Sequence, residues 1–110
     1  MNLTTNKLKE IIQNNFGVDV DSKVKNNEVV ECRIIYAKIL RDRGWTMNRI
    51  GDTINKNHST IVHYIKKYKD TIHYNKKHGL EHKYNIIKKI FESHMQNRLK
   101  SLYENEEYIY

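Results

Sequence analysis

The sequence of 110 residues has no proline, four glycines and one cysteine. Because proline and glycine end helices and build tight turns, and because alternating strand patterns are nearly absent, the composition favours a helical protein. The only cysteine, Cys32, excludes an internal disulfide and a metal cage of several thiolates. At this length we expect one domain with a single modest core.

Long hydrophobic runs are also missing. No stretch approaches the roughly 18 consecutive apolar residues that a membrane span requires. Residues 1–22 lack the order of a charged segment followed by an apolar one that is typical of a secretory signal. We therefore expect a cytoplasmic protein without a membrane partner.

Positive charge is abundant, with 20 basic and 13 acidic residues, a net charge of +7 and a pI near 9.5. Lys, Asn, Ile and Tyr fill nearly half of the sequence, and all four have AT-rich codons, so the amount of lysine alone is weak evidence for a partner. The distribution of charge is more informative. Residues 1–32 are nearly neutral, residues 56–100 carry eleven basic and three acidic side chains, and residues 104–110 form an acidic tail. This concentration of positive charge indicates a polyanionic partner.

The segment of residues 45–68, WTMNRIGDTINKNHSTIVHYIKKY, has the spacing of two helices joined by a three-residue turn. Helices that cross steeply need a very small residue at the crossing, and Gly51 lies between the apolar residues Ile50 and Ile54. Asn55 falls at the turn and tolerates the left-handed conformation better than any residue except glycine. The inner face of the second helix is expected to consist of Ile61, Tyr64 and Ile65.

Short polar residues predict where these two helices begin. Thr46 can cap the first helix, and Asn57 can cap the second by accepting a hydrogen bond from the amide of Ser59 or Thr60. The free amides of the second helix, together with His58 in its first turn, would then face a partner.

These features predict a DNA-binding helix-turn-helix over residues 46–68, with residues 57–68 as the helix that enters the major groove. An ordinary helical hairpin, which has the same packing needs, is the alternative. The helix-turn-helix is expected to belong to a DNA-binding domain that covers residues 1–78.

Hydrophobic periodicity predicts three more helices, over residues 5–16, 28–43 and 80–103. Thr5 is expected to cap the first of them. The third forms a C-terminal amphipathic element, residues 79–103, that either packs across the domain or pairs with a second copy or another protein. Its apolar stripe consists of Leu80, Tyr84, Ile87, Phe91, Met95, Leu99 and Leu102.

The segment Asn57-His-Ser-Thr-Ile-Val-His, preceded by Ile50-Gly-Asp, resembles the Asp-His-Thr-Thr-Val signature of the C-terminal DNA-binding domain of the bacterial replication initiator DnaA. The resemblance covers about residues 8–70. It implies a compact all-α helical bundle containing a helix-turn-helix, of the type of DnaA domain IV and the Trp repressor. The Gly-rich phosphate loop of the DnaA ATPase does not occur in the sequence, so we expect a standalone domain without that motor.

The resemblance also implies a role for individual residues. His58, Ser59 and Thr60 would read base edges or thymine methyl groups in the major groove, and Arg33 would reach into the minor groove. Asn57 replaces an aspartate of the family, and because an amide pairs more naturally with adenine, the preferred sequence should differ from that of DnaA. Phosphate contacts are expected from Lys56, His63, Lys66 and Lys67. The complete set expected at DNA is Arg33, Thr46, Lys56, Asn57, His58, Ser59, Thr60, His63, Lys66 and Lys67.

The six histidines all follow residue 57, and His78 and His82 have the spacing of a metal-binding pair on a helix. Gly79 interrupts that helix and no HExxH motif occurs, so we expect surface histidines and no metal site. Neither His58 nor His63 is accompanied by a nucleophile and an acid in a recognisable pattern. We therefore expect neither an enzyme nor a cofactor.

Three functions remain open. The favoured one is sequence-selective binding of double-stranded DNA in replication or transcription control, in the bacterial nucleoid or in the cytoplasm of a phage-infected host. The second is nonspecific nucleic-acid binding or packaging for an AT-rich phage or plasmid. The third is a protein-interaction module, or a homodimer, that uses the helix from Leu80 to Tyr103.

Overall fold

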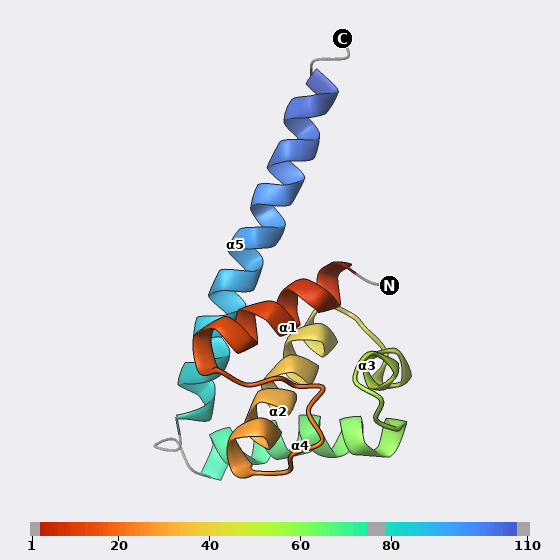
Figure 1. Cartoon of the computed structure of the whole chain (residues 1–110), viewed down its shortest axis with the longest axis vertical. Helices are drawn as coiled ribbons and strands as arrows, with labels where there is room; N and C mark the ends of the chain where they lie inside the picture. Colours follow the sequence, from red (N-terminus) through yellow and green to blue (C-terminus); the bar gives the residue numbers. More distant parts are fainter. Residues whose placement is uncertain (1–2, 75–78, 108–110) are drawn as a thin grey trace.

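The computed structural model describes the backbone of residues 3–74 and 79–107, and the side chains of residues 3–73 and 79–98. Within these ranges the chain forms five helices and no strand, so the predicted all-α class is confirmed. Figure 1 shows that α5 runs along the body formed by the other helices and extends beyond its edge. The helices are α1 (Leu3–Phe16), α2 (Asn27–Asp42), α3 (Met47–Thr53), α4 (His58–Tyr74) and α5 (Leu80–Glu107).

The first helix, α1, buries Leu8, Ile11 and Ile12 on one face. It ends at Phe16 and is followed by Gly17, whose φ of +67° is available to glycine at little cost and whose amide donates to the carbonyl of Gln13 at 2.8 Å. The prediction that Thr5 caps this helix is wrong. The helix begins at Leu3, and Thr5 lies within it with only 3% of its surface exposed.

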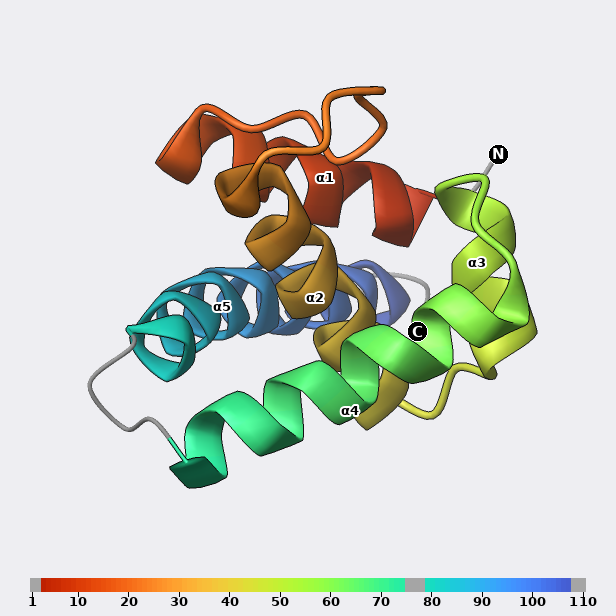
Figure 2. The same cartoon turned by 90° about the horizontal axis from the view of Figure 1, so that it is seen from below.

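The second helix, α2, lies at the centre of the bundle and packs against each of the other four helices (Figures 1 and 2). It begins at the cap Asn26, whose side-chain oxygen accepts from the amide of Val29 at 2.9 Å. A helix in this position must be apolar on most of its circumference. The residues of α2 that are buried are Val29, Cys32, Arg33, Ile34, Ile35, Tyr36, Ala37, Ile39 and Leu40.

The first part of α5 is packed against α1, α2 and α4. The four residues of its predicted stripe nearest the start of the helix are each at most 6% exposed: Leu80, Tyr84, Ile87 and Phe91. This part of α5 packs on the body, whereas the side chains of Leu99 and Leu102 lie outside the described residues. None of the described helices combines the length and the apolar character needed to cross a membrane.

Hydrogen bonds attach α5 to α2 at two points. The Tyr84 hydroxyl donates to the Asp42 carboxylate at 2.5 Å, and the Lys83 ammonium donates to Glu31 at 2.9 Å. Burial tends to raise the pKa of Asp42, but hydrogen bonds from Lys38 and Tyr84 outweigh burial and lower it below the ordinary value. The ionised carboxylate therefore stabilises the fold at neutral pH, and this contribution is lost as the pH falls through its folded-state pKa.

Replacing Tyr84 with Phe tests this attachment. We expect the free energy of unfolding at pH 7 to fall by about 0.5–1.5 kcal/mol, the usual contribution of one hydrogen bond. At a second, acidic pH, low enough to protonate Asp42, the difference from the unmodified protein should shrink. Urea unfolding at both pH values measures it, with Tyr64→Phe as the matched control. An equal loss at the two pH values would contradict the role of the ionised carboxylate.

Candidate nucleic-acid interface

The start of α3 is fixed by short-range hydrogen bonds. Gly44, with a φ of +90°, reverses the chain after α2, and the Trp45 amide donates to the carbonyl of Leu40 at 3.1 Å. The Thr46 hydroxyl accepts from the amide of Arg49 at 3.2 Å, so the predicted cap of this helix is confirmed. Its hydroxyl is occupied by this cap, although the residue is exposed.

A very close backbone contact joins α3 to α4. The Gly51 carbonyl accepts from the amides of Ile54 at 3.2 Å and Lys56 at 2.9 Å. A Cβ atom on residue 51 would lie 2.3 Å from the Lys56 carbonyl oxygen, which is too close for any side chain. Asn55 has a φ of 54°, as predicted for the turn. Glycine is therefore required at position 51 by the distance between two backbone segments.

Replacing Gly51 with Ala should force these segments apart. We expect a loss of about 1–3 kcal/mol in the free energy of unfolding, typical of overpacking at a site where backbone cannot yield easily. Thermal and urea unfolding measure this loss. Asn48→Ala, at an exposed position of the same helix, is the control and should change stability by about 0.5 kcal/mol or less. A fully stable Gly51→Ala variant would show that the contact is not needed.

Longer-range contacts hold the end of α3. The Tyr36 hydroxyl lies 2.7 Å from the Thr53 hydroxyl, which donates in turn to the carbonyl of Ile50 at 2.7 Å. Since the Thr53 proton is used in that bond, Tyr36 is the donor between the two hydroxyls. The Lys9 ammonium donates to the Thr53 carbonyl at 2.7 Å and pairs with Asp21 at 3.0 Å. Burial raises the pKa of Tyr36 to about 12, so it remains a donor at neutral pH.

The start of α4 is capped by Asn57. Its side-chain oxygen accepts from the Thr60 amide at 2.9 Å and from the Thr60 hydroxyl at 3.0 Å. The predicted cap is thus confirmed, and of the two predicted partners the structure selects Thr60 over Ser59. Because the Thr60 hydroxyl is occupied and the residue is half-buried, Thr60 helps to hold the first turn of the helix.

Two substitutions of Asn57 test its capping role. Asn57→Ala should lower the free energy of unfolding by about 0.5–2 kcal/mol, because the amide of Thr60 loses its acceptor. Asn57→Asp keeps a capping oxygen and should retain stability. Urea unfolding of the two variants measures the difference. Equal destabilisation by both variants would exclude capping as the reason.

The two sides of α4 differ sharply in exposure. The helix packs on α2, and its inner side carries Ile61, which is fully buried, and Tyr64 and Tyr68, which are each 7% exposed. Figure 2 shows α4 lying across α2, with its first turns beside α3. We call its opposite side the outer face of α4, and it consists of the exposed residues His58, Ser59, Val62, His63 and Lys66.

Val62 was not predicted to lie on this face. An apolar residue in a helical pattern is ordinarily assigned to the core, and Val62 adjoins Ile61 of the inner side. The helical spacing could have placed it, because the inner residues Ile61, Tyr64 and Tyr68 recur at steps of three and four and Val62 does not fall on these steps.

Further cations flank the outer face. Lys67 and Lys69 are exposed on α4, and Lys56 is half-buried in the turn before it. Asp70, also exposed, follows one turn after Lys66 and introduces a negative charge. The positive part of this surface therefore corresponds to the first three turns of α4 and the turn that precedes it.

Arg33 does not lie where the sequence placed it, and its prediction as a minor-groove contact is wrong. Its side chain is inside the protein, with 2% of the residue surface exposed. The guanidinium donates to the carbonyl of Val20 at 3.0 Å and to that of Ser22. These carbonyls belong to the irregular connector between α1 and α2, and Arg33 fixes the connector in place by donating to them.

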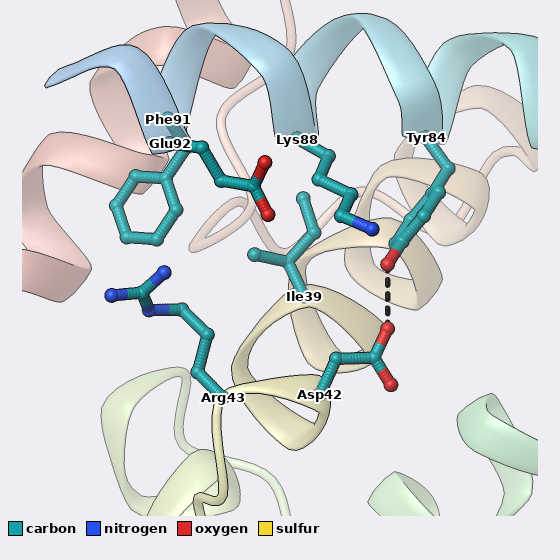
Figure 3. A pocket seen from close by; sticks show the side chains of 7 residues that line it. All are labelled: Ile39, Asp42, Arg43, Tyr84, Lys88, Phe91 and Glu92. Atoms are coloured by element: carbon teal, nitrogen blue, oxygen red, sulfur yellow. Dashed lines mark hydrogen bonds between the residues drawn. The ribbon is translucent and has the colours of Figure 1, made fainter. Parts of the chain in front are cut away.

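A cavity of about 350 Å³ between α2 and α5 is a second place where a ligand could be held. Figure 3 shows its charged residues, which are Asp42 at the end of α2, Arg43 directly after that helix, and Lys88 and Glu92 from α5. The Arg43 guanidinium lies 5.3 Å from the centre of the Phe91 ring. Two cations and two carboxylates leave the cavity without an excess of either sign, and no residue of α4 lines it, so it does not extend the positive surface.

The described residues contain no group of three or more His, Cys, Asp or Glu side chains that could hold a metal ion. His78, one member of the histidine pair considered above, lies outside the described residues. Comparisons with protein-family models, with curated proteins and with solved structures find no match to this chain.

Proposed function

We propose that the protein binds double-stranded DNA by placing the outer face of α4 in the major groove. The observation that carries this proposal is the exposure of small polar and basic side chains on the first turns of a helix that is rigidly mounted. An α-helix fits the width of the major groove, and side chains on its outer face reach the base edges. The close approach of Gly51 to the Lys56 carbonyl and the hydrogen bond between the hydroxyls of Tyr36 and Thr53 support a fixed orientation of α3 and α4.

His58 and Ser59 are the polar residues best placed to contact base edges. Both are exposed in the first turn of α4, and both can donate and accept hydrogen bonds. Asn57 is more restricted. Its oxygen already accepts two hydrogen bonds from Thr60, so only its amide nitrogen can approach a base. The bidentate adenine contact needs both atoms, and Asn57 therefore contributes less discrimination than the sequence predicts.

Lysines beside the outer face supply the sequence-independent part of the affinity. Lys66 and Lys67 are exposed on α4, and Lys56 lies in the preceding turn. Release of condensed counterions by such contacts makes the affinity fall steeply as the salt concentration rises. Asp70 opposes phosphate binding further along the helix, so we expect the duplex to contact the first three turns of α4.

Selection from a pool of random duplexes at two salt concentrations tests the proposal. We expect a preferred sequence, and replacement of His58 and Ser59 with Ala should reduce the preference by about 1–3 kcal/mol for each base contact that is lost. A protein that binds every duplex equally at both salt concentrations would instead be a nonspecific nucleic-acid binder.

Salt dependence separates phosphate contacts from the general charge of the chain. The double variant Lys66→Gln, Lys67→Gln should make the slope of log affinity against log salt shallower by about 0.9 per lysine. Fluorescence anisotropy with a labelled duplex measures the slope. The control is Lys89→Gln, which removes one charge from an exposed site on α5. If Lys89→Gln changes the slope as much as each α4 lysine does, the duplex is not bound specifically at α4.

A further inference from the structure

Val62 is the apolar member of the outer face of α4, with 42% of its surface exposed. The other large hydrophobic residues that the structure describes as exposed lie on other elements: Leu3 in α1, Val24 in the connector and Ile90 in α5. On its own face Val62 has polar neighbours, His58 one helical turn before it and Lys66 one turn after it. An apolar side chain is thus set among groups that are suited to polar contacts.

Folding does not account for a valine at this position. The inner side of α4 is already filled by Ile61, Tyr64 and Tyr68, which are almost completely buried. A β-branched residue is also a poorer helix former than alanine or lysine at an exposed site. The single valine is too small to form an apolar patch of the kind that docks a protein partner. A single exposed valine is ordinary on a protein surface, and what distinguishes Val62 is its place among the polar side chains of the outer face.

The chemistry of valine narrows the contact to one feature of the duplex. Valine neither donates nor accepts a hydrogen bond, so it gains nothing from a phosphate or from the polar edge of a base. The apolar group that the major groove presents is the C5 methyl group of thymine. Because the valine side chain has one strongly preferred rotamer in a helix, its two methyl groups form a rigid surface for that contact.

We propose that Val62 contacts the C5 methyl group of a thymine and so makes the protein select thymine at one position of its duplex. This inference rests on the proposed binding of α4 in the major groove, and it specifies which base is selected and which group of that base is contacted. Val62 lies in the second turn of α4, beyond His58 and Ser59, so the selected thymine is expected within the base pairs that the helix covers and not at their border.

Replacing thymine with deoxyuracil removes only the methyl group and tests the contact directly. In the preferred duplex from the random pool, each thymine is replaced in turn, and the affinity of the full chain is measured by fluorescence anisotropy at one salt concentration. At one position we expect the replacement to weaken binding about fourfold, the factor that corresponds to removing one methyl-sized apolar contact. With Val62→Ala, that position should no longer distinguish thymine from deoxyuracil, while other positions remain unchanged.

Control variants keep the result interpretable. Val62→Ala should fold normally, because the residue is exposed and alanine favours helix, and Val62→Thr keeps the branched shape with one methyl group. If Val62→Ala does not fold, Val62→Thr takes its place in the test. A smaller loss of affinity on replacing thymine with deoxyuracil in Val62→Thr than in the unmodified protein supports the contact, and an equal loss excludes it. If the protein prefers one duplex but no deoxyuracil effect depends on Val62, the inference is overturned and the proposed function stands. If no duplex is preferred, both are overturned.

Discussion

The distance between Gly51 and the carbonyl of Lys56 determines how α3 and α4 are joined. Only a residue without a side chain allows this approach, since a Cβ atom would lie 2.3 Å from the carbonyl oxygen. The same glycine accepts two amide hydrogen bonds from the turn, so the closure of the turn and the end of α3 depend on one residue. Asn55 completes the reversal by adopting a left-handed conformation. The direction in which α4 leaves the turn is thereby fixed before any tertiary contact is considered.

The central helix, α2, holds α3 and α4 in place by contacting the end of α3 and the inner side of α4. Tyr36 contributes its hydroxyl to Thr53 at the end of α3, while Tyr64 and Tyr68 pack the inner side of α4 on α2. These contacts occupy the inner side of α4 and leave its outer face exposed. The proposed duplex contact thus depends on packing that lies on the opposite side of the helix. The helix α5 adds to this packing through its contacts with α2 and α4, where the rings of Tyr68 and Tyr84 lie 5.0 Å apart.

The sequence predicts best those features that depend on residues close together in the chain. The caps Thr46 and Asn57 are of this kind, because a cap is recognised from its own side chain and the helix that follows it. Arg33 was misplaced because its role was taken from the resemblance to DnaA, whereas its burial depends on carbonyls of a connector eleven and thirteen residues earlier. The hydrogen bond between Lys9 and Thr53 spans 44 residues and leaves no local signal. Val62 was assigned no role from the sequence, although the predicted inner face of Ile61, Tyr64 and Ile65 leaves it on the other side of the helix.

Proton–nitrogen correlation spectra of the full chain, recorded while the preferred duplex is added, test the central claim most directly. The account predicts that the largest changes in amide chemical shift fall within residues 56–67, with little change along the part of α5 that lines the cavity with α2. If the largest changes occurred instead around Arg43 and Lys88, or were spread evenly over all basic segments, α4 would not be the element that binds DNA.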